Sequence, residues 1–367
     1  QISTAANIAI PTANRPTIAN LPSATVLRGS PLHVPIDAYD PNGNPLTITV
    51  TSSNPSAITA EVLTGNQSAR ISTANFGDMV FELFDSEAPR ATGRFKQLAN
   101  SGFYNSTGTN RMTFHRVIET FMIQGGDPTG TGSGGSTLGT FNDQFNLNLQ
   151  HNRSGVLSYA KSSDDTNDSQ FFITAGPTRW LDFNHSIFGQ LIEGDATRAG
   201  IARTTVNSSD KPLNDVVINS ISIFDDAENG LVRLKAIGTA GATATITVTA
   251  TDSEGNSTSQ TFVATVVNDT SNEPPFLNDI SPVNVVAGQP ITFQISAQDN
   301  AGDTVRYSAS RPTNQTVNYQ VSADATTGQV TVVPPPNFTG SFQVLVSASR
   351  TSTPTSGVQD DNQLVTI

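Results

Sequence analysis

The sequence predicts a mainly β protein made of two copies of one β-domain, the first of which carries a long insertion. Both flanks of the chain alternate strictly between Thr and Val, Ile or Ala, as in residues 243–250, the period-two pattern of half-buried strands. Two motifs recur at fixed offsets. The middle of the chain differs, because 14 of the 19 Phe lie between residues 68 and 226.

The repeat can be read as two gapless alignments. Residues 32–44 align on residues 291–303 at an offset of 259, and residues 230–250 align on residues 328–348 at an offset of 98. The offset falls by 161, so about 160 extra residues stand in the middle of the first copy. The segment rich in Phe is therefore predicted to be an insertion into the first copy.

The first copy, residues 1–67 and 228–269, contains seven segments with strand patterns, each bounded by Gly, Pro, Asn or Asp. Seven strands suit an immunoglobulin-like β-sandwich. The second copy, residues 270–367, repeats this pattern without interruption. Both copies resemble bacterial immunoglobulin-like domains of the cadherin-like type, through motifs such as residues 38–47. The expected strands of the first copy lie near 21–27, 32–39, 46–52, 58–64, 231–236, 243–251 and 259–267.

Composition excludes several classes of function. Lys and Arg number 19 against 31 Asp and Glu, a net charge of −12 without any basic run, which argues against nucleic acid and anionic membranes as partners. The absence of Cys excludes disulfides, thiolate zinc sites and cysteine nucleophiles. No apolar stretch approaches the ~20 residues of a membrane span. We expect a secreted or cell-surface chain, with the periplasm as a further compartment.

The insert, residues 68–227, begins and ends with strand patterns. Phe95, Leu98 and Ala99 recur at helical spacing, and Gly102 supplies a helix stop, so a helix is expected over about 88–99. A closed barrel whose first and last strands are adjacent would bring its ends together. Such a domain can occupy a single hairpin of a host sandwich.

Two neighbouring blocks of the insert, residues 113–118 and 121–127, resemble the cyclophilin signature. This resemblance implies a closed eight-stranded β-barrel capped by two helices. It also implies peptidyl-prolyl cis-trans isomerase activity on proline-containing polypeptides, without a cofactor or a metal. Further blocks that match the family are residues 102–104, 130–135, 155–160, 169–173, 180–182 and 188–189.

Isomerisation of an X-Pro bond must cross a barrier of ~18–20 kcal/mol that comes from amide resonance, and no covalent step is required. An arginine beside an apolar pocket can favour the twisted amide, whose nitrogen regains its lone pair. The resemblance implies catalytic roles for Arg116, Phe121 and Gln124. It implies substrate binding by Met122, Ala160, Lys161, Gln170, Phe172, Trp180, Leu181 and His185.

Lys161 departs from the family, because many members have Asn at that position. We expect its backbone to pair with the extended substrate and its presence to shift the preference for the residue before proline. The pocket residues resemble those of members that bind cyclosporin-type ligands, so binding of such a ligand is also expected.

Other interpretations of the same residues remain open. Residues 130–135 match Gly-x-Gly-x-x-Gly, but no helix pattern follows, so a dinucleotide site is disfavoured. Asp40, Asp252, Asp299 and the 272–275 linker could suggest calcium, although ordinary turns are favoured. The rival function is a non-enzymatic adhesion or matrix protein. Its insert would only bind proline-containing peptides, and its sandwiches would bind a surface partner.

Overall fold

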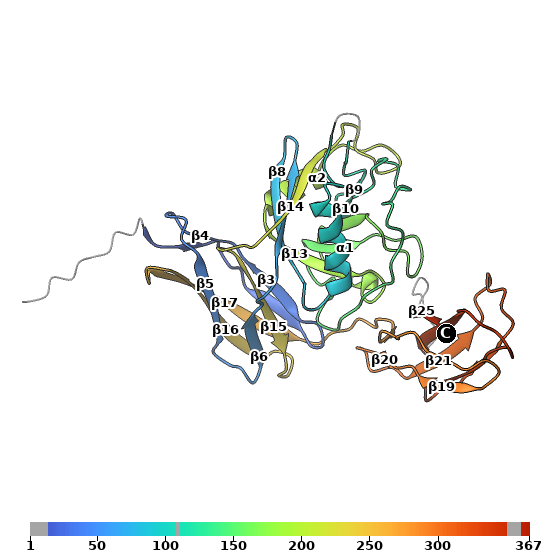
Figure 1. Cartoon of the computed structure of the whole chain (residues 1–367). Helices are drawn as coiled ribbons and strands as arrows, with labels where there is room; N and C mark the ends of the chain where they lie inside the picture. The colour runs from blue at the N-terminus through green and yellow to red at the C-terminus, as the bar shows by residue number, and fades with distance from the viewer. Residues whose placement is uncertain (1–13, 108–110, 351–360) are drawn as a thin grey trace, which may run out of the picture.

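The computed structural model describes residues 14–107, 111–350 and 361–367, and it contains three β-rich units (Figure 1). We call residues 68–224 the central unit. The first β-unit comprises strands β1–β6 and β15–β17, and the second β-unit comprises strands β18–β25. Among the helices of the described residues, none is long and apolar enough to cross a membrane.

The first β-unit contains two main sheets, with strand orders β3-β15-β6 and β2-β17-β16-β5. Alternation along β16 explains its packing, because Ala244, Ile246 and Val248 are buried while the Thr residues between them are more exposed. The strands are β1 (Thr17–Ile18), β2 (Ala24–Leu27), β3 (Leu32–Ile36), β4 (Ala38–Tyr39), β5 (Leu46–Ser52), β6 (Ile58–Val62), β15 (Gly230–Ala236), β16 (Thr243–Asp252) and β17 (Ser257–Val267).

The second β-unit repeats this strand order. Its main sheets run β19-β23-β22 and β21-β24-β25, so the strands matched by the sequence offsets occupy corresponding places in the two units. The strands are β18 (Phe276–Leu277), β19 (Ile291–Gln294), β20 (Ala297–Gln298), β21 (Val305–Ser310), β22 (Gln320–Ala323), β23 (Gln329–Val333), β24 (Gln343–Arg350) and β25 (Asp361–Thr366).

The central unit leaves and re-enters the first β-unit at one place. Strands β6 and β15, the last before it and the first after it, are antiparallel neighbours, with Val62 opposite Val232 (Figure 1). The first and last strands of the central unit, β7 and β14, are also antiparallel neighbours, with Ser68 opposite Phe224. Few residues are therefore needed to connect the two units.

The central unit has one curled eight-stranded sheet in the order β14-β7-β8-β13-β11-β12-β10-β9. The segment just before β9 also reaches β14, because Ile218 N donates to Met112 O at 2.8 Å and Thr113 bridges Val217. A continuous closed barrel stays a prediction. The strands are β7 (Ser68–Thr73), β8 (Gly77–Leu83), β9 (Arg116–Ile118), β10 (Met122–Gly125), β11 (Val156–Tyr159), β12 (Phe171–Thr174), β13 (Ile187–Glu193) and β14 (Ile218–Phe224).

Two α-helices, α1 (Pro89–Asn100) and α2 (Asp195–Ala202), and a short 3-10 helix, η2 (Arg179–Leu181), accompany this sheet. Helix α1 begins with proline, which lacks the N–H that a first turn leaves unpaired. It ends before Gly102, whose φ of +74° suits glycine. The fully buried ring of Phe95 packs on Phe188, with ring centroids 4.9 Å apart, and fixes α1 to the sheet.

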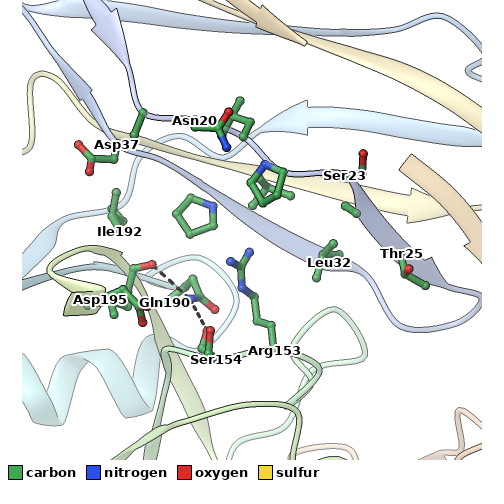
Figure 2. Close-up of a pocket in the computed structure, with 17 residues that line it drawn as sticks. Asn20, Ser23, Thr25, Leu32, Asp37, Arg153, Ser154, Gln190, Ile192 and Asp195 are labelled. Carbon is green, nitrogen blue, oxygen red and sulfur yellow. Dashed lines mark hydrogen bonds between the residues drawn. The ribbon is translucent and has the colours of Figure 1, made fainter. Parts of the chain in front are cut away.

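The central unit also packs against the first β-unit around a cavity of about 520 Å³. Figure 2 shows Arg153 of the central unit pointing into this cavity, opposite Asn20 and Leu32 of the first β-unit. Arg153 donates to the backbone oxygen of His33, and burial lowers the pKa of Arg153 to about 10. Burial likewise lowers the pKa of His33 to about 3, so this interface holds a neutral imidazole.

The aromatic core around α1 allows a direct test of stability. Replacing Phe95 by Ala is expected to destabilise the central unit by about 3–5 kcal/mol, because a fully buried ring is lost and a cavity remains. Phe95→Leu keeps most of the volume and is expected to cost less than about 1.5 kcal/mol. Urea unfolding followed by circular dichroism measures both, and equal losses for the two variants would contradict the packing argument.

Candidate active site

The candidate site begins with the strand pair β9–β10. Arg116 lies directly opposite Gln124 in this antiparallel pair, so both side chains stand on the same face of the sheet. The Arg116 side chain is 44% exposed, and its Nε lies 3.6 Å from Oδ2 of Asp210. The guanidinium is thus held at the surface, where a ligand can reach it.

An apolar pocket lies beside this arginine. Met122, Phe172 and Leu181 form one buried cluster, separate from the main core, and Phe121 and Ala160 pack against it. Phe171, the neighbour of Phe172 on β12, belongs to the main core instead, as the alternation of a strand requires. Trp180 stands at the rim, 65% exposed, with its ring 5.8 Å from that of Phe121.

His185 completes the pocket wall. Its ring meets that of Phe172 edge-on at 5.5 Å, and its Nδ1 lies 2.9 Å from the backbone oxygen of Tyr159. A carbonyl oxygen can only accept, so Nδ1 carries the proton of the neutral ring. Burial lowers the pKa of His185 to about 4, and the pocket therefore contains no histidine charge near neutral pH.

A polar groove of about 790 Å³ adjoins the pocket. Gln124 Nε2 donates to Oε1 of Gln170 at 3.0 Å, and Gln170 Nε2 donates to the backbone oxygen of Gly134 at 2.8 Å. Ala160 and Lys161 also line the groove. The structure thus brings together all eleven residues that the sequence assigned to the site.

The glycine-rich loop at 130–135 forms one side of this groove and is organised by Asp127. The Asp127 carboxylate accepts hydrogen bonds from the backbone N–H groups of Thr129, Thr131, Gly132 and Gly134, at 2.6–3.1 Å. A phosphate bound by this loop would need these N–H groups as donors, but the Asp127 carboxylate already occupies them. The loop shapes the groove and is not suited to bind a dinucleotide.

The side chain of Lys161 is directed away from solvent and into a cluster of carboxylates. The side chain is 3% exposed, and its ammonium pairs with Asp143 and, at 3.4 Å, with Asp164. Asp143, Asp164 and Asp165 are close enough together to hold a cation, and Lys161 supplies the positive charge there. A charged lysine is therefore not presented to the substrate, and only the backbone of Lys161 remains for substrate pairing.

The aspartates that suggested calcium make turn contacts in the structure. Asp40 Oδ1 accepts from the backbone N–H groups of Asn42 and Asn44, at 2.9 and 3.0 Å. Asp252 repeats this pattern two and four residues downstream, and Asp299 accepts from Asp303 N at 2.7 Å. These are ordinary Asx-type turn bonds.

Sequence reasoning missed the polar support behind the pocket. His151 is fully buried, stacks on Phe172 with ring centroids 5.9 Å apart, and binds Asp182 Oδ1 through Nδ1 at 3.0 Å. Asp182 also pairs with Arg179 at 3.0 Å. Asp182 stands in one of the quoted sequence blocks, but no local pattern connects it to His151.

Comparison with known proteins agrees with this geometry. The model of the cyclophilin type peptidyl-prolyl cis-trans isomerase family matches residues 68–223. A Staphylococcus haemolyticus protein assigned as a peptidyl-prolyl cis-trans isomerase is 42% identical over 181 residues, covering 41% of this chain and 88% of that protein. A Staphylococcus aureus protein assigned in the same way is 43% identical over 179 residues, with the same coverage. The chain belongs to the cyclophilin family.

A solved structure is also similar to this cyclophilin. The crystal structure of a cyclophilin type peptidyl-prolyl cis-trans isomerase from Cryptosporidium parvum is 40% identical, with a TM-score of 0.41. It covers 44% of this chain, and 99% of that chain is matched. The same protein has been solved in the presence of the dipeptide Ala-Pro. The activity of the present chain is peptidyl-prolyl cis-trans isomerisation, and the central unit carries it.

The neutral state of His185 can be tested by NMR. Because burial lowers its pKa from the usual 6.5 to about 4, its ring signals are expected to stay constant between pH 5 and 8. The unfolded chain takes up a proton near pH 6.5 that the folded chain does not, so the contribution of His185 to stability declines as the pH falls below that value. A His185 midpoint near pH 6.5 in the folded protein would contradict the buried, neutral assignment.

Proposed function

We propose that this cyclophilin isomerises X-Pro bonds by a non-covalent mechanism in which Arg116 stabilises the twisted amide beside the apolar pocket. The observation that carries the proposal is the placement of an accessible guanidinium next to the cluster of Met122, Phe172 and Leu181. A proline ring bound in the cluster would leave its amide facing Arg116. The neighbouring groove would hold the residues that precede proline.

The mechanism follows from the electronics of the amide. In the planar state the nitrogen lone pair is delocalised, and twisting localises it on nitrogen, where a donor can bind it. Arg116 donates to this developing lone pair and therefore favours the twisted state over the planar ones. Gln124 would hold the substrate carbonyl side, and Phe121 would close over the ring.

We further propose that the protein acts outside the cytoplasm, on extracellular or surface polypeptides. The support is the resemblance of both flanking copies to bacterial cadherin-like domains. A cyclosporin-type ligand is expected to compete for the same pocket. The alternative, an adhesion or matrix protein whose insert only binds proline-containing peptides, predicts peptide binding without catalysis.

Replacing Arg116 by Ala tests the mechanism. We expect a loss of about 10²–10³ in kcat/KM with the fold intact, because a half-exposed arginine contributes to the transition state rather than to the core. NMR exchange spectroscopy on an Ala-Pro peptide measures the rate. Arg70→Ala is the matched control, since that side chain is similarly exposed, at 42%, and ion-paired on distant β7. An undiminished rate in Arg116→Ala would reject the mechanism.

The domain division is also part of the proposal: residues 1–67 and 228–269 form one sandwich, residues 68–227 the isomerase, and residues 270–367 a second sandwich. The direct pairing of β6 with β15 supports it.

A variant in which a short Gly/Ser linker replaces residues 68–227 is expected to keep folded β-domains, because the ends to be joined are already hydrogen-bonded neighbours. Circular dichroism and thermal melting measure this. A disordered spectrum, with residues 1–67 folding well alone, would instead favour a linear string of domains.

A further inference from the structure

The central unit, the first β-unit and the linker to the second β-unit meet at one guanidinium, that of Arg179. Within the central unit, Arg179 pairs with Asp182 at 3.0 Å. Its Nη2 pairs with Asp269, at 2.6 Å, and with Glu273, both in the linker to the second β-unit. Its Nη1 donates to Oγ of Ser30 in the first β-unit at 2.6 Å. A change in the position of the linker would therefore displace the Arg179 side chain.

Arg179 is the first residue of η2, and the rest of η2 borders the proline pocket. Trp180 forms the rim and Leu181 belongs to the apolar cluster. The Asp182 carboxylate continues the chain of contacts to His151, whose ring stacks on Phe172. Displacement of Arg179 would thus move both the rim and the wall of the pocket.

The opposite side of the groove is also attached to the second β-unit. Residues 161–168 contribute Lys161, Ser162, Thr166 and Asp168 to the groove. Within this segment, Asp164 Oδ2 accepts hydrogen bonds from the backbone N and from Nδ2 of Asn362, at 2.9 and 3.1 Å. Asn362 lies on β25 of the second β-unit, so both sides of the groove have contacts outside the central unit.

Burial distinguishes the Arg179 contacts from ordinary surface ion pairs. The side chains are 15% exposed for Arg179, 12% for Asp269 and 2% for Glu273. Removing a partner from such a buried group reduces the compensation of its charge, which costs more than loss of an exposed pair. The Arg90–Asp279 pair, which also joins the second β-unit to the central unit, is 34% and 63% exposed and lies on α1.

We infer that the linker and the second β-unit position the isomerase groove in cis, with Arg179 as the positioning residue for the pocket rim. The inference rests on the proposed function for the assignment of the groove. Its physical basis is that Arg179 of η2 pairs both with the linker carboxylates Asp269 and Glu273 and with Asp182, which supports the pocket through His151. An attached domain thereby sets how tightly the site holds an extended substrate.

The test is the full chain carrying Asp269→Asn together with Glu273→Gln, which removes both linker charges from Arg179 and leaves the isomerase sequence untouched. KM for an Ala-Pro peptide is expected to rise roughly three- to tenfold with kcat within about twofold, because substrate positioning is lost and the chemical groups remain. Trp180, the single tryptophan of the sequence, reports on the rim, and its quenching by acrylamide is expected to increase.

Asp279→Asn is the matched control, since it removes the more exposed ion pair between α1 of the central unit and the second β-unit and leaves Arg179 and its partners unchanged. It is expected to leave KM and Trp180 quenching unchanged. Unchanged KM and quenching in the folded double variant would overturn the inference, as would equal effects of Asp279→Asn.

If the double variant does not fold, the single Glu273→Gln variant is expected to show the same changes at smaller size, and wild-type values in it would equally overturn the inference. Failure of the proposed function gives a different result from failure of this inference. If the wild-type chain were inactive, the proposed function would fail, and the quenching of Trp180 in the double variant would still test the inference.

Discussion

The architecture depends on one constraint, that the central unit begins and ends at nearly the same point of the first β-unit. Two strand pairs meet this requirement together. On the host side β6 and β15 are hydrogen-bonded neighbours, and on the insert side β7 and β14 are. Because both pairs are antiparallel, the chain passes from one sheet to the other and returns without crossing either sheet. Each unit has its own buried cluster, and Leu231 of β15 joins the cluster of the central unit.

The isomerase site follows from the edge of the curled sheet. Strands β9 and β10 place Arg116 and Gln124 side by side, and β12 supplies one core residue, Phe171, and one pocket residue, Phe172. Regular alternation along β12 therefore places Phe172 in the apolar pocket without any irregularity of the strand. Burial keeps His185 neutral, so in the proposed mechanism the guanidinium of Arg116 is the charge beside the amide of a bound proline.

Much of this could be predicted from the sequence, because its signals are local. Alternation along residues 243–250 indicated β16, the helical spacing around Phe95 indicated α1, and the contiguous blocks around Arg116 and Phe121 indicated the site. Contacts between distant residues left no such signal. Arg179 and Glu273 are 94 residues apart and either could be a surface charge, and the buried state of Lys161 depends on Asp143 from another segment. Glu273, in the linker segment that could suggest calcium, pairs with Arg179.

The parallel pairing of β2 with β17 has a mechanical consequence. Strand β2 follows only the two-residue strand β1 at the N-terminal side, β17 is the last strand before the linker, and Ala24 to Leu27 lie beside Ala264 to Val267. Tension on the two ends of the first β-unit pulls these strands in opposite directions along their axes, so the hydrogen bonds between them are loaded in shear and must break together. The whole isomerase lies in the loop of chain between β2 and β17. Its own backbone therefore carries no load until that ladder fails, and tension on the chain acts on its groove through the linker carboxylates that pair with Arg179.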